Sequence, residues 1–402
     1  MKIRINKGTA AGTVCAPPSK SMSHRLLILA AMCDGVSTVR GISDCDDVLA
    51  TLDCLKALGV KHKQCGNAVT VYGKDPKEMH AAYPLNCRES GSTLRFLIPV
   101  AMLKEQTTVF RVGKTLASRP MSVYESLFCE LGLTYIGSEE DITVSGQLNG
   151  GEFTIPGNVS SQFISGLLLA LPAANEDSTI RILPPIESRS YIDMTVDALK
   201  SFGVNAVWLD EYTISIRGKQ KYTPCDITVE GDYSGAAFLE ALSLFGADVR
   251  IDGLCTDTKQ GDRAYKDYYE MLTYGAPTIN IADCPDLGPI LFAVAAAKNG
   301  GVFTGTHRLK TKESDRARAM AEELRKFGAS VTVDEDAVIV RPKALHAPSE
   351  PLCGHNDHRI VMALSVLLTL TGGEIDGAEA VSKSYPAFFE DLTALGIEVT
   401  AG

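Results

Sequence analysis

Basic side chains occupy comparable positions along the chain, next to predicted helices. Seven such residues are Lys20, Arg25, Arg119, Lys312, Arg316, Arg359 and Lys383. The chain as a whole is acidic, with a formal charge of −10 from 49 acidic and 39 basic residues. Arginine binds carboxylates and phosphates through paired hydrogen bonds. The seven bases therefore predict a binding site for small substrates that carry several negative charges.

Hydroxyl, amide and glycine residues accompany these bases. Lys20-Ser21 and Ser160-Ser161-Gln162 stand at two predicted helix starts, where hydroxyls and free N–H groups bind phosphate. Gly91, at a third start, lets a ligand approach the backbone closely. Ordinary helix capping explains the serines as well. Taken alone, Ser188 and Tyr191, which precede a later helix, do not decide between the two interpretations.

Two acidic residues could transfer protons. Asp286 leads an apolar segment, and a carboxylate that faces several cations stays ionised and can accept a proton from a hydroxyl. A plain helix cap is the structural alternative. Glu313 lies between Lys312 and Arg316, which at a spacing of four residues are predicted to share one side of a helix. His358 and Arg359 directly precede an apolar run, which favours a functional role for them.

An internal repeat indicates which elements position these residues. Six segments read as an amphipathic helix that ends in glycine and is followed by a strand, about 67 residues apart on average. Each terminal glycine is predicted to adopt the left-handed conformation that ends helices. The six are Gly59, Gly132, Gly203, Gly275, Gly328 and Gly396.

Each repeat also contains an earlier, more apolar helix and a following strand. A unit thus reads helix, strand, helix, then one or two strands. One unit cannot bury a core, whereas three packed together can, which predicts two domains of three units. The apolar helices of each domain should point their positive N-terminal ends at one face, and two such faces form an anion-binding cleft.

Composition excludes several classes of protein. The 402 residues include 45% hydrophobic and 22% charged residues, as in a globular protein of two or three domains. The acidic balance argues against nucleic-acid and membrane partners. The N-terminal sequence lacks the apolar core of a signal peptide, and the apolar runs are too short for a bilayer. Eleven cysteines without metal-ligand spacing predict reduced thiols, mostly buried, in a cytoplasmic protein without a structural zinc.

The chain resembles the 5-enolpyruvylshikimate-3-phosphate (EPSP) synthase family from end to end. The resemblance rests on PPSKSMSHR, SGSTLR, SRPM, SSQFISGLL, the Pro-Asp of CPDLGP, LKTKESDR, NDHRIVMA and KSYPAFF, in the family's order. It implies an α/β fold, an inside-out α/β barrel in each of two domains, with six βαβαββ units, three per domain. Domain 1 would comprise residues 1–12 plus 228–402, and domain 2 residues 13–227, with crossings near Thr13 and Ile227 and the active site in the cleft.

The resemblance implies transfer of the enolpyruvyl group of phosphoenolpyruvate to the 5-hydroxyl of shikimate 3-phosphate, by a monomer without cofactor or metal. Asp286, Glu313, Lys20 and Lys312 would be catalytic: Asp286 would take the hydroxyl proton and Glu313 would protonate the methylene carbon. Shikimate 3-phosphate would bind Lys20, Ser21, Arg25, Ser160, Ser161, Gln162, Ser188, Tyr191, Asp286 and Lys312. Phosphoenolpyruvate would bind Lys20, Gly91, Arg119, Gln162, Arg316, His358, Arg359 and Lys383.

Some positions depart from the family's common pattern, and two other functions compete. Glu89, Phe96, Ser190 and Arg308 stand where many members carry Asn, Pro, Pro and Asn. UDP-N-acetylglucosamine enolpyruvyl transferases share the fold, but typically carry Lys-Asn in the first motif and a cysteine before the Arg-Pro. Here those places read Lys20-Ser21 and Ala117-Ser118-Arg119. A non-catalytic anion-binding relative would be expected to lose Asp286, Glu313 or Lys312, and all three are present.

Overall fold

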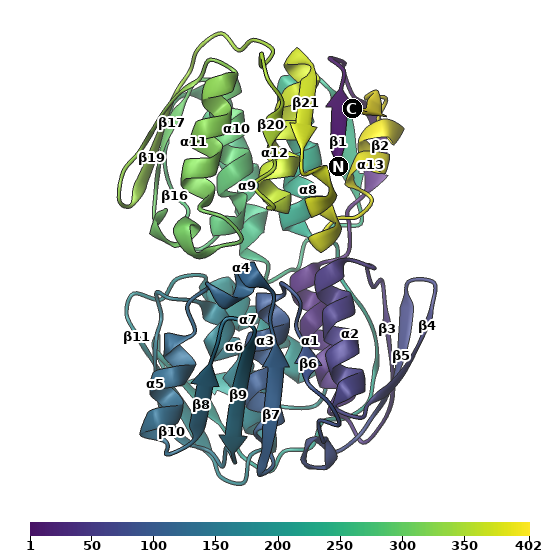
Figure 1. The fold of residues 1–402 in the computed structure, drawn as a ribbon, viewed down its shortest axis with the longest axis vertical. Helices are drawn as coiled ribbons and strands as arrows, with labels where there is room; N and C mark the ends of the chain where they lie inside the picture. Colours follow the sequence, from purple (N-terminus) through teal and green to yellow (C-terminus); the bar gives the residue numbers. More distant parts are fainter. The chain divides into compact units, whose positions relative to one another are not determined.

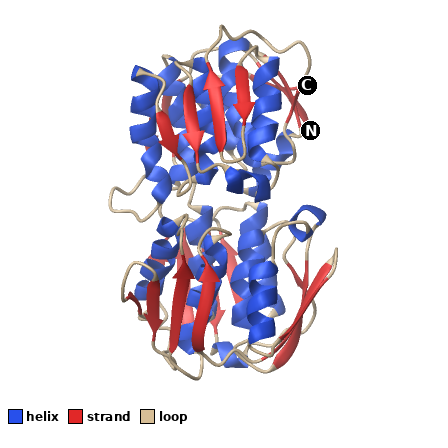
Figure 2. Cartoon of the chain, turned by 90° about the vertical axis from the view of Figure 1, so that its left-hand side faces the viewer, coloured by secondary structure: helices blue, strands red, loops and turns tan.

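The computed structural model describes residues 1–402 and divides into two compact units. One unit comprises Lys20–Glu230, and the other comprises Met1–Ser19 with Gly231–Gly402. The sequence placed the crossings a few residues earlier, near Thr13 and Ile227. Strand pairing explains the difference. Thr13 lies in a strand that pairs with residues 248–252 of the discontinuous unit, and Ile227 pairs with Val39 of the unit Lys20–Glu230. Figures 1 and 2 show mixed helices and strands in both units.

The unit Lys20–Glu230 is built from a repeated β-α-β-α-β-β arrangement. In its middle copy, β6 (Leu85–Asn86) runs parallel to β7 (Gln106–Arg111). Strand β9 (Asp141–Gly146) pairs antiparallel with β7, and β8 (Thr134–Gly137) pairs with β9. Helix α3 (Gly91–Ala101) connects β6 to β7, and α4 (Lys114–Ala117) and α5 (Ser122–Glu130) connect β7 to β8. Figure 1 labels the helices of this copy beside its sheet.

The other two sheets of this unit have the same strand order. One is β10-β11-β13-β12 and the other is β14-β3-β5-β4. The strands are β3 (Gly35–Arg40), β4 (Lys61–Cys65), β5 (Ala68–Gly73), β10 (Gly151–Pro156), β11 (Ser178–Leu183), β12 (Ala206–Trp208), β13 (Thr213–Ile216) and β14 (Asp226–Thr228). The helices are α1 (Lys20–Ala31), α2 (Asp46–Ala57), α6 (Ser161–Ala170) and α7 (Arg189–Ser201). Thus the first copy takes its leading strand, β14, from the end of the unit.

The second unit contains two complete sheets, β16-β17-β19-β18 and β20-β21-β1-β22. Their strands are β1 (Lys2–Ile5), β16 (Thr278–Asn280), β17 (Gly301–Thr304), β18 (Ser330–Val333), β19 (Ala337–Arg341), β20 (Leu352–Cys353), β21 (Gly373–Asp376) and β22 (Val399–Ala401). The third copy has only β2 (Ala11–Cys15) and β15 (Asp248–Asp252), so one expected repeat is incomplete. The helices are α8 (Tyr233–Glu240), α9 (Tyr265–Tyr274), α10 (Gly288–Ala297), α11 (Arg316–Lys326), α12 (His358–Thr371) and α13 (Phe388–Ala394).

Each unit has its own hydrophobic core, formed around the apolar helices predicted from the sequence. Residues Met22–Ala31 of α1 and Gly288–Ala296 of α10 are buried. Strands such as β9 and β19 alternate buried and partly exposed residues, so one sheet face packs on helices and the other meets water. This packing fixes the helix starts, where the candidate site residues lie.

Two expectations from the sequence are wrong. Five of the terminal glycines have a left-handed φ between +67° and +91°, but Gly275 is extended with φ −173°. Gly275 ends a helix of the incomplete repeat, where no strand hairpin follows. The eleven cysteines are free thiols, as expected, but only five are buried.

No helix has both the length and the apolar composition needed to cross a membrane.

Candidate functional site

Arg25 is held in the unit Lys20–Glu230 by neutral acceptors. Its guanidinium donates to Thr195 Oγ1 at 2.8 Å, to Ser165 Oγ at 3.3 Å and to the carbonyls of Ser21 and Tyr191 at 2.6 and 3.0 Å. The side chain is 2% exposed, and this burial lowers the pKa of Arg25 to about 10. A buried guanidinium whose partners are all uncharged retains a full positive charge for an anionic ligand.

Lys20, the first residue of α1, pairs with a carboxylate of α2. Its Nζ lies 2.9 Å from Asp47 Oδ2, and both side chains are largely shielded from water. Asp47 is not among the site residues predicted from the sequence. Asp46 and Asp47 both lie in the first turn of α2, where acidic residues commonly stabilise a helix. The sequence alone therefore gives no reason to choose Asp47 over Asp46.

Gly91 lies against two guanidinium groups. A Cβ atom added to Gly91 would stand 2.9 Å from Arg119 Nη1 and 3.0 Å from Arg95 Nη1. Arg95 donates to Gln162 Oε1 at 2.7 Å, and Gln162 Nε2 donates to Ser92 Oγ at 2.9 Å. The structure therefore brings the predicted residues Gly91, Arg119 and Gln162 together, and it adds Arg95, which the prediction omitted.

The other predicted residues of this unit lie at the starts of α6 and α7. Ser160 caps α6, and its Oγ accepts from the Gln162 amide at 3.3 Å. Ser161 is buried in the first turn of the same helix. Ser188 precedes α7 in the left-handed conformation with φ 56°, and Tyr191 in the first turn offers its carbonyl to Arg25. Arg25 thus connects the starts of α1 and α7.

Asp286 is the centre of a charged cluster in the other unit. Its Oδ1 lies 3.1 Å from Lys312 Nζ and 2.8 Å from Arg316 Nη1, and its Oδ2 lies 3.3 Å from Arg359 Nη2. Asp286 belongs to a short 3-10 helix, Pro285–Leu287, and makes no capping hydrogen bond to α10. The carboxylate therefore faces three cations and does not act as the cap that was the structural alternative.

Arg316 is saturated with carboxylates. Besides Asp286, it donates from Nη2 to Glu313 Oε2 at 2.6 Å and from Nε to Asp357 Oδ2 at 2.8 Å. Arg316 is 1% exposed and Asp357 is fully buried. Asp357 also caps α12 through the Arg359 amide and accepts from Ser314 Oγ at 3.0 Å. An anionic substrate that binds Arg316 must compete with these carboxylates.

Arg359 belongs to this cluster, His358 lies beside its Asp357, and Lys383 contacts the neighbouring residue Asn356. Arg359 Nη1 donates to Ser234 Oγ at 2.6 Å. His358 is buried, with Nδ1 4.0 Å from Asp357 Oδ1. Lys383 Nζ donates to the carbonyl and side-chain oxygens of Asn356 at 2.6 and 2.8 Å. At the start of α8, Asp232 caps the helix and Ser234 binds the Arg359 guanidinium.

The charges of the cluster shift one another's proton affinity. Burial by itself would raise the pKa of Asp286, but Lys312, Arg359 and Arg316 outweigh it and hold that pKa well below its usual range. Burial lowers the pKa of Lys312 to about 8, although Asp286 opposes the shift. At neutral pH the cluster therefore contains an ionised carboxylate and a protonated lysine whose pKa lies below the usual lysine value.

One geometric prediction for this cluster is wrong. Lys312 and Arg316 do not share a helix face, because α11 begins at Arg316 and Lys312 follows the 3-10 helix His307–Thr311 in an extended conformation. Both cations nevertheless reach Asp286 Oδ1.

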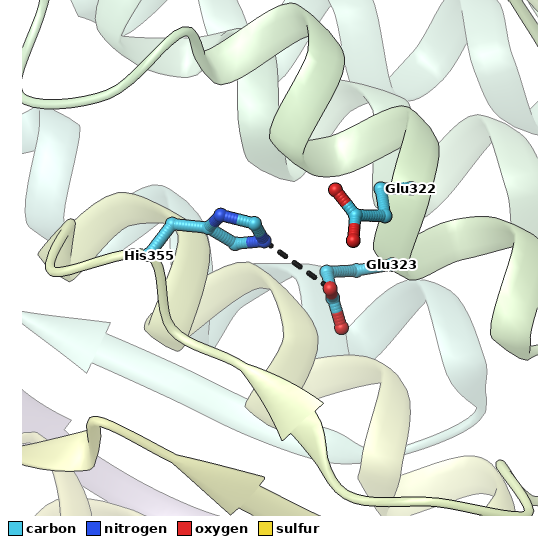
Figure 3. Close-up of side chains that lie close together, drawn as sticks. All are labelled: Glu322, Glu323 and His355. Carbon is cyan, nitrogen blue, oxygen red and sulfur yellow. Dashed lines mark hydrogen bonds and ion pairs between the residues drawn. The ribbon is translucent and has the colours of Figure 1, made fainter.

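A separate group of potential metal ligands lies on the same unit. Glu322, Glu323 and His355 hold ligand atoms within 4.8 Å of one another (Figure 3). Glu323 Oε1 already accepts from His355 Nε2 at 3.2 Å and lies 3.1 Å from Lys326 Nζ. An ammonium group that neutralises the buried carboxylate disfavours a cation there. The contact instead ties His355 to α11.

Solved structures identify the fold. An EPSP synthase from Acinetobacter baumannii superposes with a TM-score of 0.79 at 25% sequence identity, over 99% of both chains. The enolpyruvyl transferase NikO from Streptomyces tendae gives a TM-score of 0.79 at 16% identity, over 99% of this chain and 98% of that one. At that low identity, NikO supports the fold alone. The fold is a mixed α/β fold shared with enolpyruvyl transferases.

Sequence comparison narrows the class. Residues 6–392 match the family described as EPSP synthase (3-phosphoshikimate 1-carboxyvinyltransferase). The 3-phosphoshikimate 1-carboxyvinyltransferases of Clostridium novyi and Clostridium kluyveri are each 37% identical to this chain. The alignment with the C. novyi protein covers 98% of this chain and 97% of that protein. The alignment with the C. kluyveri protein covers 99% of this chain and 98% of that protein. The chain belongs to the EPSP synthase family.

Proposed function

We propose that the charged cluster around Asp286 and the residues around Arg25 and Gly91 in the other unit together carry out the reaction of this family. The enzyme, a 3-phosphoshikimate 1-carboxyvinyltransferase of the shikimate pathway, transfers the enolpyruvyl group of phosphoenolpyruvate to the 5-hydroxyl of shikimate 3-phosphate and releases phosphate. The observation that carries the assignment of roles is the Asp286 carboxylate between Lys312, Arg316 and Arg359. It combines a proton acceptor with cations that suit anionic substrates.

Shikimate 3-phosphate is proposed to bind mainly to residues of the unit Lys20–Glu230. Arg25 supplies a buried charge whose partners are neutral, and the start of α6 supplies hydroxyl and amide groups. The proposed ligands are Lys20, Ser21, Arg25, Ser160, Ser161, Gln162, Ser188 and Tyr191, with Asp286 and Lys312 from the other unit.

Phosphoenolpyruvate is proposed to bind cations from both units. Gly91 lets the Arg119 guanidinium lie against its backbone, and Arg316 and Arg359 offer planar donors that match a carboxylate or phosphate. The proposed ligands are Lys20, Gly91, Arg119, Gln162, Arg316, His358, Arg359 and Lys383. The anionic groups of phosphoenolpyruvate replace the carboxylates of Asp286 and Glu313 as partners of Arg316 and Arg359.

The addition step of the proposed chemistry needs two proton transfers. Glu313 delivers a proton to the methylene carbon, which makes the adjacent carbon cationic, and the 5-hydroxyl attacks that carbon while Asp286 takes its proton. The methyl group of the tetrahedral adduct then returns a proton to Glu313 as phosphate leaves and the enolpyruvyl double bond re-forms. The departing phosphate takes up the hydroxyl proton held by Asp286. When substrate anions draw Arg316 away, Glu313 loses its ion pair and Asp286 loses part of the charge that lowers its proton affinity. Substrate binding thereby prepares both carboxyl groups.

We further propose that the two compact units are the two domains of the family fold, each an inside-out α/β barrel built from three βαβαββ units. The repeated strand order supports this interpretation, and the reduced β2-β15 pair is the exception. We also propose that the enzyme acts in the cytoplasm as a monomer.

Phosphate release tests the function. Purified protein is mixed with phosphoenolpyruvate and either shikimate 3-phosphate or UDP-N-acetylglucosamine. Release with shikimate 3-phosphate alone, abolished in Lys20→Ala and in Asp286→Ala, supports the proposal. Release with the nucleotide sugar alone would assign the chain to the other enolpyruvyl transferases. Binding of shikimate 3-phosphate without turnover would identify a non-catalytic relative.

A further inference from the structure

Glu89 reaches from one segment of its unit to the backbone of another. Its Oε2 accepts from the Leu116 amide at 2.8 Å, and its Oε1 accepts from the Thr115 amide at 3.3 Å. These amides belong to the first turn of α4, whose start offers no capping side chain of its own because the preceding residue is Gly113. Glu89 therefore caps α4 from 26 residues away in the sequence.

The backbone around Gly113 is fitted to this carboxylate. A Cβ atom on Gly113 would lie 2.3 Å from Glu89 Oε1, so a side chain at this position would push the carboxylate away. The Gly113 amide also donates to the Arg88 carbonyl at 2.6 Å. The segment that begins α4 is thus held to residues 88 and 89 by three hydrogen bonds in all.

Arg119 lies at the other end of this short segment. The Arg119 amide donates to the Leu116 carbonyl at 3.0 Å, so the residue that Glu89 holds also fixes the backbone of Arg119. The Arg119 guanidinium stands over Gly91, two residues after Glu89. The segment Glu89–Gly91 therefore contacts Arg119 in two ways. Glu89 holds the backbone of Leu116, which accepts from the Arg119 amide, and Gly91 contacts the Arg119 guanidinium.

We infer that Glu89 is a positioning residue, which sets the location of the Arg119 guanidinium through the backbone of residues 113–119. The inference rests on the proposed function in one respect, because it expects the effect of Glu89 to appear in the binding of phosphoenolpyruvate. The carboxylate acts through backbone amides and does not touch the substrate.

Two readouts test this inference in the full-length enzyme. Loss of a helix cap corresponds to roughly a 3- to 30-fold effect, so Glu89→Ala is expected to raise KM for phosphoenolpyruvate by that factor. KM for shikimate 3-phosphate should stay within about twofold of the wild type. Glu89→Gln, which keeps one acceptor oxygen, should fall between wild type and Glu89→Ala. Glu130→Ala, an exposed glutamate of the same unit, serves as the control and should leave both constants unchanged.

Hydrogen exchange gives the second readout, which does not depend on activity. Amides of residues 115–119 should exchange faster in Glu89→Ala and in Gly113→Ala, whose new methyl group displaces the carboxylate, while exchange in α6 stays unchanged. In an Arg119→Ala background, Glu89→Ala should raise KM for phosphoenolpyruvate no further. Unchanged exchange in residues 115–119, or a full additional effect in that background, would overturn the inference. A wild-type enzyme inactive with both substrates would count against the proposed function, and the exchange experiment would still decide the role of Glu89.

Discussion

Arg359 of α12 donates a 2.6 Å hydrogen bond to the Ser234 hydroxyl of α8, 125 residues earlier in the chain. Both residues are buried, and the same guanidinium lies 3.3 Å from Asp286. The incomplete repeat, which lacks a strand hairpin and contributes no cation, thus supplies the acceptor that orients a cation of its neighbour. The incomplete repeat therefore contributes Ser234 to the candidate site.

Ser234→Ala should weaken phosphoenolpyruvate binding. Loss of a hydrogen bond to a charged group predicts a fall of about 10- to 100-fold in kcat/KM for phosphoenolpyruvate. KM for shikimate 3-phosphate should change little. Steady-state kinetics with each substrate varied in turn measure both, with Ser243→Ala as the control. Equal losses for both substrates would point to a general structural defect.

Asp286→Asn should separate binding from turnover. Removal of a general base lowers kcat by about 100- to 10,000-fold. The amide no longer competes for Lys312, Arg316 and Arg359, so the Kd of phosphoenolpyruvate in calorimetry should stay equal or become lower. Asp334→Asn, an exposed aspartate of the same unit, is the matched control. Weaker binding together with normal turnover would contradict the role assigned to Asp286.

Lys312 should produce an alkaline limit of activity. Its pKa is about 8, below the usual lysine value because of burial, so the ammonium is present below pH 8 and is lost as the pH rises through that value. Since kcat/KM reports the free enzyme, it should fall above about pH 8. Lys312→Arg keeps its charge and should move the fall to higher pH. A pH profile identical in the variant would assign the limit to another group.

Two glycines that look equivalent in the sequence should respond differently to alanine. Gly132 has φ +67° with no atom close to an added Cβ, so Gly132→Ala should lower the free energy of unfolding by about 1 to 2 kcal/mol through backbone strain alone. Gly275 is extended and equally open, so Gly275→Ala should leave stability unchanged or raise it by up to about 1 kcal/mol. Denaturant unfolding of both variants measures the difference, and equal losses would refute it.

The sequence predicts the repeated elements well, because each repeat carries a strong apolar period and a glycine that ends its outer helix. Bases beside apolar helices are also conspicuous in the sequence, and the structure places three of them, Lys312, Arg316 and Arg359, around Asp286. Their acceptors are less visible. Asp47, Ser234 and Asp357 have residue types that ordinary caps and first turns also use, and only packing shows that they face a lysine or an arginine. The role of Glu89 as the cap of α4 cannot be predicted from the sequence, because it depends on the contact with Gly113 and the amides of Thr115 and Leu116.

The place of β1 has a consequence for how the chain acquires its structure during synthesis. Strand β1 lies in the middle of its sheet, with Ile3 opposite Ile375 on one side and Ala401 on the other. At about 5 to 20 residues per second, a ribosome needs roughly 20 to 75 seconds to make the roughly 370 residues that separate these partners. During that time residues 20–230 are already complete and free to fold, while the first strand waits unpaired. Strand β1 can therefore take its place in the sheet only after β21 and β22 have been made.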